Sequence, residues 1–139
     1  MALLLVRHGS AGDRDDWEGD DRARPLDERG RAQAAALVDA LAGYPVDRVL
    51  TSPAVRCVET IAPLAAARGV EPEPREELSE ELQWTAGAEL LRTLDGRDVV
   101  VCGHGGLDAA VRDAPKWKKG ATFVLGPGLE LERVIPRRA

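Results

Sequence analysis

The sequence lacks any apolar run that approaches the roughly 20 residues a membrane-spanning helix requires. It also lacks the marks of a signal peptide. The apolar segment from Met1 to Val6 has no basic residue before it and no small-residue cleavage site after it. The two cysteines, Cys57 and Cys102, are too few for a disulfide framework, and we expect both to be reduced residues of the core. Together these absences predict a cytoplasmic protein that does not associate with membranes.

The chain has no excess of positive charge. It contains 19 Lys and Arg residues against 24 Asp and Glu residues, and its formal net charge is −5. General binding to nucleic acid is therefore disfavoured. No Asp, Glu or His cluster has metal-ligand spacing, and no glycine-rich loop ends in the Lys-Ser/Thr pair of a P-loop. We therefore expect no metal site and no cofactor.

Length and composition favour one globular domain over residues 1–139. A chain of this length buries roughly two-thirds of the surface that its unfolded form exposes, which is enough for a single core. The composition, 44% hydrophobic and 31% charged, is typical of globular rather than disordered proteins. No internal repeat, low-complexity tract or linker divides the chain.

Predicted strands and helices alternate along the chain, which is typical of an α/β fold with a parallel sheet. Apolar runs predict strands at residues 3–6, 46–51 and 99–102, and a hairpin with strands at 122–125 and 129–134. Helices are expected at about residues 27–41, 53–67, 86–94 and 107–112. Polar segments at 9–25 and 71–84 are predicted to be loops, with a short strand within the second as the alternative.

The first candidate for chemistry is Arg7-His8-Gly9, directly after a predicted strand. Ligands of open α/β sheets bind beyond the carboxyl ends of the strands. Arg7 supplies a forked, permanent cation that suits phosphate oxygens, and neutral His8 supplies a nucleophilic nitrogen. Gly9 has no side chain, so its backbone can approach a ligand closely. The alternative interpretation is an ion pair on the surface at the end of a strand.

The second candidate is Gly103-His104-Gly105-Gly106, which also follows a predicted strand. Glycines on both sides of the histidine again suggest a close approach of the backbone, here at Gly105. A structural histidine of the core is the alternative. However, the chain has only two histidines, and both follow predicted strands within glycine-containing turns.

The third candidate is Arg56, in the first turn of the helix predicted after the second strand. Ser52 is predicted to cap this helix, with Pro53 at its first position. A cation is normally disfavoured at a helix N-terminus because the helix dipole is already positive there. Arg56 is explained if an anion binds in front of the helix. A solvated arginine that reaches sideways is the alternative.

The three candidates bring two arginines, two histidines and one helix N-terminus to the same edge of a sheet. The result is a strongly cationic pocket in an acidic protein. Because no metal or nucleotide-loop motif accompanies it, the pattern indicates phosphoryl transfer through a phosphohistidine.

These segments resemble the histidine phosphatase, or phosphoglycerate mutase-like, superfamily. The matching pieces appear in the family's order, at Leu5 to Gly9, Pro25 to Gly30, Thr51 to Thr60 and Val101 to Gly106. The resemblance implies a three-layer α/β domain with a mostly parallel central sheet flanked by helices. It implies His8 as the nucleophile, and Arg7, Arg56 and His104 as the phosphate pocket.

The resemblance also bears on the general acid, which the family often supplies from a Leu-x-Glu sequence between Arg56 and His104. Leu78-Ser79-Glu80 fits this spacing, which makes Glu80 the candidate acid, and Glu76, Glu77 and Glu81 compete with it. A solvated acidic loop is the alternative. Phosphohistidine phosphatases of the SixA type can lack this acid, because phosphohistidine is an easier leaving group to expel.

The small size and the sequence Arg-His-Gly-Ser-Ala-Gly look more like SixA-type phosphohistidine phosphatases than mutases. The stretch Arg-Pro-Leu-Asp-Glu-Arg-Gly also looks like the phosphatase domain attached to Nudix domains in some bacterial proteins. The expected substrate is therefore a phosphohistidine protein or a small phosphoester. The alternatives are a mutase-like or nucleotide-directed enzyme of the same fold, or a phosphate-binding module without catalysis.

Two further segments bear on the substrate. The acidic loop from Asp13 to Asp21 is interpreted as a solvated loop, with a lid as the alternative. As a lid it would bring Arg14 to a second phosphate and Trp17 to a base or ring. The segment after His104 is short and reaches Pro115 quickly, so one pocket wall is either open or rebuilt by residues 116–119.

Overall fold

A computed structural model of the chain describes residues 1–138, and these form one six-stranded sheet in the order β3-β2-β4-β1-β5-β6. The strands are β1 (Leu3–Arg7), β2 (Arg48–Thr51), β3 (Pro72–Pro74), β4 (Val99–Gly103), β5 (Thr122–Gly126) and β6 (Glu130–Ile135). Neighbours from β3 to β1 pair parallel, whereas β5 is antiparallel to both β1 and β6. The predicted mostly parallel α/β sheet is confirmed, and β3 adds a short edge strand.

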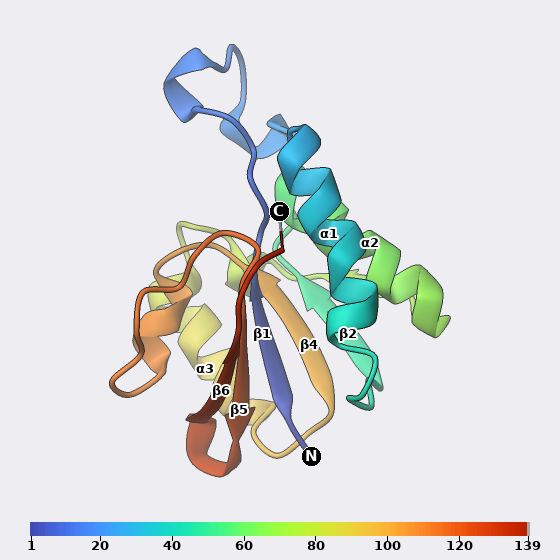
Figure 1. Cartoon of the computed structure of the whole chain (residues 1–139). Helices are drawn as coiled ribbons and strands as arrows, with labels where there is room; N and C mark the ends of the chain where they lie inside the picture. Colours follow the sequence, from blue (N-terminus) through green and yellow to red (C-terminus); the bar gives the residue numbers. More distant parts are fainter. Residues whose placement is uncertain (139) are drawn as a thin grey trace.

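Helices cover both faces of the sheet, so the molecule has three layers (Figure 1). Helices α1 (Glu28–Ala40) and α2 (Val55–Arg68) pack side by side on one face. Helix α3 (Ala88–Thr93) lies on the other. No helix within residues 1–138 has the length and apolar character needed to span a bilayer.

Two hydrophobic cores form because side chains alternate across each strand. In β1, Leu3 and Leu5 face α3, whereas Leu4 and Val6 face α1 and α2. All four residues are almost completely buried. Covering both faces explains why the central strands are continuous apolar runs rather than alternating ones.

Several local predictions are confirmed and others are wrong. The hairpin of β5 and β6 forms as expected, and α2 ends at Gly69, whose φ of 65° closes the helix in the left-handed region. Ser52 and Pro53 do not begin α2. The helix starts at Val55 with Ala54 as a cap that offers no side-chain hydrogen bond. The cap prediction failed because the Ser52 hydroxyl contacts the His104 ring instead.

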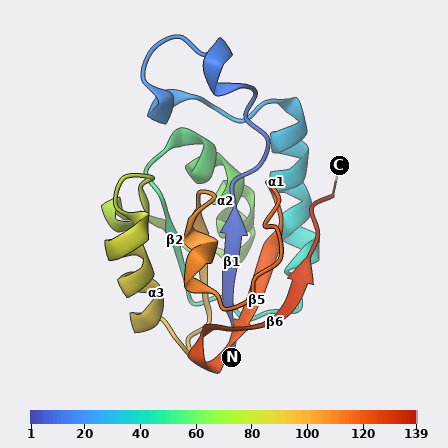
Figure 2. The same cartoon turned by 90° about the vertical axis from the view of Figure 1, so that its left-hand side faces the viewer.

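The helices predicted nearer the C-terminus are shorter and less regular than expected. A π-helical turn over Gln83–Gly87 precedes α3, and residues Leu107–Ala110 form a 3₁₀ turn instead of an α-helix. Between β1 and α1, the chain rises beyond the carboxyl end of β1 as a long loop (Figure 2). This loop contains two 3₁₀ turns, Arg14–Asp16 and Asp21–Ala23, each begun by an aspartate that caps it.

Candidate active site

The two histidines follow neighbouring strands. β1 and β4 are paired with Arg7 opposite Gly103, so His8 and His104 are each the first residue beyond that pair. The backbone N–H of His8 continues the ladder by donating to the Gly103 carbonyl at 3.1 Å. The parallel register thus brings together two residues that lie far apart in the sequence.

His8 is held as a neutral imidazole with one nitrogen free. Its Nδ1 lies 2.7 Å from the carbonyl oxygen of Gly9, which assigns the proton to Nδ1 and the lone pair to Nε2. Among residues 1–138, no group hydrogen-bonds to Nε2. Burial lowers the pKa of His8 to about 3. The electrostatic interactions with His104, Arg56 and Arg7 act in the same direction, whereas the Gly9 contact opposes them.

Arg7 presents its guanidinium to the same space. Its Nη1 donates to the carbonyl of Trp117 at 2.7 Å, and its buried Nε has no hydrogen-bond partner within residues 1–138. Gly105 makes room for this group, because a Cβ at that position would lie 2.9 Å from Arg7 Nη2. An unpaired guanidinium nitrogen beside a nucleophile is suited to receive a phosphate oxygen.

His104 is oriented by Ser52, the residue expected to cap α2. The Ser52 hydroxyl lies 2.8 Å from His104 Nε2 and also accepts a hydrogen bond of 3.3 Å from the Ala54 N–H. Because Nε2 is bound to Ser52, Nδ1 is the nitrogen that faces the site, where it lies 3.5 Å from Arg56 Nη2 and 3.7 Å from Glu80 Oε1.

Arg56 is 1% exposed and is bound to acidic groups. Its Nη2 donates to Glu80 Oε1 at 2.6 Å and to Asp21 Oδ2 at 3.0 Å, and its Nη1 donates to the Asp21 carbonyl at 2.8 Å. The anion expected in front of α2 is therefore supplied by the chain's own carboxylates. A phosphate that binds Arg56 must take the place of one of them.

Glu80 is the glutamate of its segment that reaches His104. Both of its oxygens accept hydrogen bonds from Arg14 Nη2, at 2.9 and 3.0 Å, in addition to the bond from Arg56. The three competing glutamates are paired outside the pocket, Glu76 and Glu81 with Arg22 and Glu77 with Arg75. Between two guanidinium groups, Glu80 acts as a hydrogen-bond acceptor.

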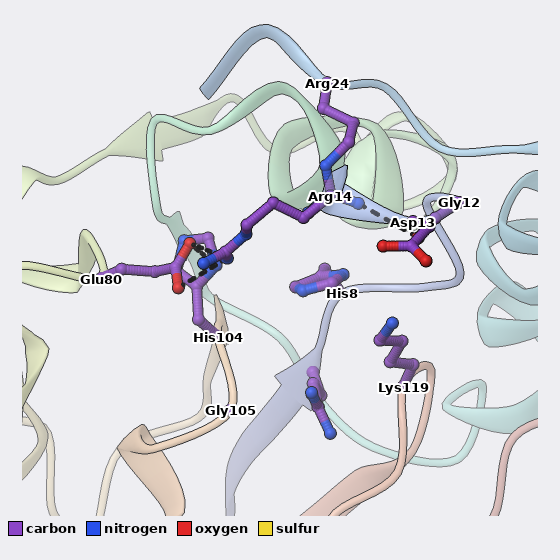
Figure 3. Close-up of a pocket in the computed structure, with 10 residues that line it drawn as sticks. His8, Gly12, Asp13, Arg14, Arg24, Glu80, His104, Gly105 and Lys119 are labelled. Carbon is purple, nitrogen blue, oxygen red and sulfur yellow. Dashed lines mark hydrogen bonds and ion pairs between the residues drawn. The ribbon is translucent and has the colours of Figure 1, made fainter. Parts of the chain in front are cut away.

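These residues surround a cavity of about 460 Å³ at the carboxyl edge of the sheet (Figure 3). The residues that line it are Arg7, His8, Gly12, Asp13, Arg14, Arg24, Glu80, His104, Gly105 and Lys119. Arg56 lines an adjoining cavity of about 100 Å³ that shares Glu80 and His104 with the first. Nearly all of the predicted site residues therefore meet in one place.

Gly9 is the predicted site residue that does not line either cavity. Its N–H donates to Thr60 Oγ1 at 2.9 Å, and a Cβ here would lie 3.0 Å from the carbonyl oxygen of Gly30 in α1. The glycine therefore permits close packing of the chain after His8 against α1. The close approach that we predicted exists, but the structure shows it toward a helix rather than toward the cavity.

Sequence reasoning missed Arg24, Asp21 and Lys119. Arg24 donates to the Ala11 carbonyl and to Asp21 Oδ1, so it holds the loop over the cavity. Charged residues of a polar loop carry no periodic signal that would single them out. The segment 116–119 does rebuild a pocket wall, since Trp117 binds Arg7 and Lys119 lines the cavity.

The two cysteines are free and buried. Cys57 Sγ lies 3.7 Å from His104 Nε2 on the core side of the ring. Within residues 1–138, no group of three or more His, Cys, Asp and Glu side chains is arranged to hold a metal ion.

Comparison with known proteins agrees with this arrangement. The family model of the histidine phosphatase superfamily (branch 1) matches residues 3–87. Over 63 residues, or 45% of the chain, the sequence is 54% identical to an 8-oxo-(d)GTP phosphatase of Mycolicibacterium smegmatis. The aligned part is 20% of that protein, so the chain spans about a fifth of the length of this curated relative.

Solved structures show the same fold. The protein histidine phosphatase SixA in complex with tungstate superposes with a TM-score of 0.80 at 20% identity, over 97% of this chain and 96% of that one. The putative SixA of Agrobacterium tumefaciens gives 0.75 at 22% identity, covering 97% of both chains. The putative SixA of Nakamurella multipartitia gives 0.74 at 25% identity, over 99% of this chain and 96% of that one.

Proposed function

Because the chain belongs to branch 1 of the histidine phosphatase superfamily and is a phosphatase, we propose that it works without a metal ion through a phosphohistidine on His8. The observation that carries the proposal is the state of His8. Its Nδ1 is bound to Gly9, its Nε2 lone pair is free, and its ring is buried beside cationic groups. Residues 1–139 then act as one catalytic domain.

In the first step, the Nε2 lone pair of His8 attacks phosphorus in line with the leaving group. The P–O bond, or the P–N bond of a phosphohistidine substrate, breaks, and its electron pair departs with the leaving group. Arg7, Arg56 and His104 stabilise the charge on the equatorial oxygens. Arg56 does so after exchanging a carboxylate of Asp21 or Glu80 for phosphate, since both carboxylates bind it in the free protein.

In the second step, water attacks the phosphohistidine. The P–N bond breaks, its electron pair returns to Nε2, and phosphate is released. Glu80 is suited to this step, because a hydrogen-bond acceptor at that place can orient the water and take its proton. Its role as the acid of the first step requires that it first leave one of its two guanidinium partners.

For the substrate, we propose a phosphohistidine protein or a small phosphoester. The overall fold similarity to SixA supports the first of these, and the small, cationic cavity supports the second. A nucleotide-directed phosphatase is a second candidate. It is favoured by the 54% identity to the 8-oxo-(d)GTP phosphatase over 63 residues.

The experiment that tests this proposal is to trap the phosphoenzyme. The protein is mixed in EDTA with a phosphohistidine peptide, an aryl phosphate, a sugar phosphate and a nucleoside diphosphate, then quenched within milliseconds. We expect an acid-labile, base-stable phosphoryl group on His8, formed fastest with the physiological class of substrate. Turnover without any phosphoenzyme, or label on another residue, contradicts the mechanism.

A further inference from the structure

Lys119 is a cation in the cavity that the proposed reaction does not use. Its side chain lines the space next to His8. Its ammonium group has no hydrogen bond or ion pair within residues 1–138. Burial lowers the pKa of Lys119, as do the charges of Arg7, Arg24 and Arg56, and only Asp27 opposes them. A cation surrounded by other cations is stabilised strongly by an anion that enters the cavity.

The backbone fixes Lys119 relative to the nucleophile. The N–H of Gly120 donates to both the Arg7 and His8 carbonyls, at 3.1 and 3.0 Å. Gly120 has a φ of 83°, a conformation that favours glycine and that turns the chain at this point. The ring of Trp117, 2% exposed, anchors the other side of the turn through a 3.1 Å hydrogen bond to the Ala121 carbonyl. Lys119 is therefore attached to the strand end that carries His8.

Two other cations of the cavity, Arg14 and Arg24, already have charged or carbonyl partners. Arg14 is bound to Glu80, and Arg24 is bound to Ala11 and Asp21. Lys119 stands across His8 from Glu80 and His104 (Figure 3). A phosphoryl group in transfer lies against Arg7 and His104, so Lys119 faces whatever is attached to that phosphoryl group. Its charge suits a second anionic group there.

A second cavity continues the first on the side of the long loop. It measures about 360 Å³ and shares Gly12, Asp13 and Arg24 with the catalytic cavity. Its walls include Trp17, Pro25 and Leu26. The Trp17 indole is held by a hydrogen bond of 2.9 Å from Nε1 to the Asp20 carbonyl, and the residue is 37% exposed. This surface suits a flat ring with an apolar face.

We propose that Lys119 forms a second phosphate subsite, and that the preferred substrate is a small phosphoanhydride carrying a flat ring, such as a nucleoside diphosphate. The inference rests on the proposed function and names its substrate class. His8 Nε2 bonds to the terminal phosphorus, and the P–O bond to the bridging oxygen breaks. The electron pair stays on that oxygen, which becomes a terminal oxygen of the leaving phosphate beside Lys119.

The state of Glu80 agrees with this leaving group. A phosphate oxygen leaves as a stable anion and needs no proton, whereas an alkoxide does. Glu80 accepts hydrogen bonds from both Arg14 and Arg56, so in this arrangement it has no proton to give. A phosphohistidine substrate would also be expelled with little help, but it would bring no second phosphate to Lys119.

The test compares Lys119→Gln with Lys118→Gln, a matched change at an exposed lysine of the same turn. Each variant is assayed on a nucleoside diphosphate, the matching monophosphate, an aryl phosphate and a phosphohistidine peptide. We expect wild type to prefer the diphosphate. Lys119→Gln should lower its kcat/KM by about 10- to 100-fold, the usual effect of losing a charge-assisted hydrogen bond, mostly through KM. The loss on the aryl phosphate should be at least tenfold smaller, and Lys118→Gln should resemble wild type.

Lys119→Arg provides a second test. This variant keeps the positive charge, so it should retain most of the wild-type activity on the diphosphate. An equal loss on all four substrates would overturn the subsite, as would a wild type that prefers the monophosphate or the peptide. Such results leave the proposed function standing as long as His8 is still phosphorylated. Absence of a His8 phosphoenzyme with every substrate overturns the proposed function instead.

Discussion

The imidazole rings of His8 and His104 meet edge to face, with their centroids 5.5 Å apart and their planes at 65°. The parallel register of β1 and β4 produces this contact, because each histidine is the first residue after the pair Arg7 and Gly103. The edge of one ring thus approaches the other ring beside the cavity. His104 can therefore contact a phosphoryl group that is bonded to His8.

Replacing the nucleophile should abolish the reaction. We expect His8→Ala to show no turnover and to form no acid-labile phosphoenzyme, since no other neutral imidazole lies at that place. The measurement is quenched labelling with an aryl phosphate, and thermal unfolding serves as the control for a folded protein. Activity similar to wild type in a folded His8→Ala protein would disprove the mechanism.

Metal removal should leave activity unchanged. The charge stabilisation is assigned to Arg7, Arg56 and His104, so turnover should survive excess EDTA. Vanadate, which adopts the five-coordinate geometry of phosphorus in transfer, should inhibit. Initial rates before and after chelation are compared, with added Mg²⁺ and Zn²⁺ as controls. A strict requirement for either ion would contradict this assignment.

Ser52 should act as a positioning residue for His104. Removing its hydroxyl in Ser52→Ala takes away the 2.8 Å contact that orients the ring. We expect kcat to fall by about 10-fold, in proportion to losing one hydrogen bond of about 1.4 kcal/mol, with KM little changed.

Thr122→Val is the matched control for Ser52→Ala. Thr122 is a buried hydroxyl on β5 whose Oγ1 has no hydrogen-bond partner within residues 1–138. If Ser52 contributed to stability alone, the kcat of folded Ser52→Ala would equal that of Thr122→Val, and only its unfolding temperature would be lower. That outcome would remove Ser52 from the reaction.

Stability should depend on pH through His8. Burial lowers the pKa of His8 from 6.5 to about 3, so the unfolded chain takes up a proton that the folded chain does not. This contribution to stability is complete above pH 6.5 and is lost as the pH falls toward 3. The free energy of unfolding falls by at most about 1.4 kcal/mol per pH unit through this effect.

Urea unfolding of wild type and His8→Ala at pH 7, 6, 5 and 4.5 measures this effect. The free energy of unfolding of wild type should decrease more steeply below pH 6.5 than that of His8→Ala, so the two curves converge. Parallel curves would show that His8 has the same pKa in the folded and the unfolded protein.

Glu80→Gln separates the classes of leaving group. An alkoxide needs a proton, and general acid catalysis contributes roughly 10²- to 10⁴-fold. We therefore expect a loss of that order on an alkyl phosphate and a much smaller one on a phosphohistidine peptide or an aryl phosphate. Glu81→Gln, an exposed neighbour paired with Arg22, is the control. An equal, severe loss on all three substrates would mean that Glu80 acts in the second step, which all three share, rather than on the leaving group.

The sequence predicted well those site residues that lie at the ends of strands. His8, His104 and Arg56 follow buried strands or open a helix, and hydrophobic periodicity marks such positions. Because the carboxyl ends of parallel strands share one edge, the same pattern also predicted that these residues would meet. The order of the strands, with β1 between β4 and β5, was not contained in that pattern.

The remaining residues depend on contacts that no local pattern encodes. Ser52 has the sequence context of a helix cap, but a 2.8 Å contact with a residue on another strand uses its hydroxyl instead. Glu80 was one of four nearby glutamates, and only the positions of Arg14 and Arg56 distinguish it. Lys119 was noted only as part of a wall, since its importance comes from the turn that Gly120 fastens to His8.

The central place of β1 has a consequence for biosynthesis. The strand that carries the nucleophile precedes both of its neighbours in the chain, since it pairs with β4 and β5, with Leu3 opposite Val99 and Leu125. A chain still growing on the ribosome therefore holds an unpaired apolar strand until residue 125 has been added. Pairings this distant in sequence form slowly, and an exposed strand edge promotes aggregation. The edge of the sheet that carries His8 therefore cannot assemble before β5 has been made.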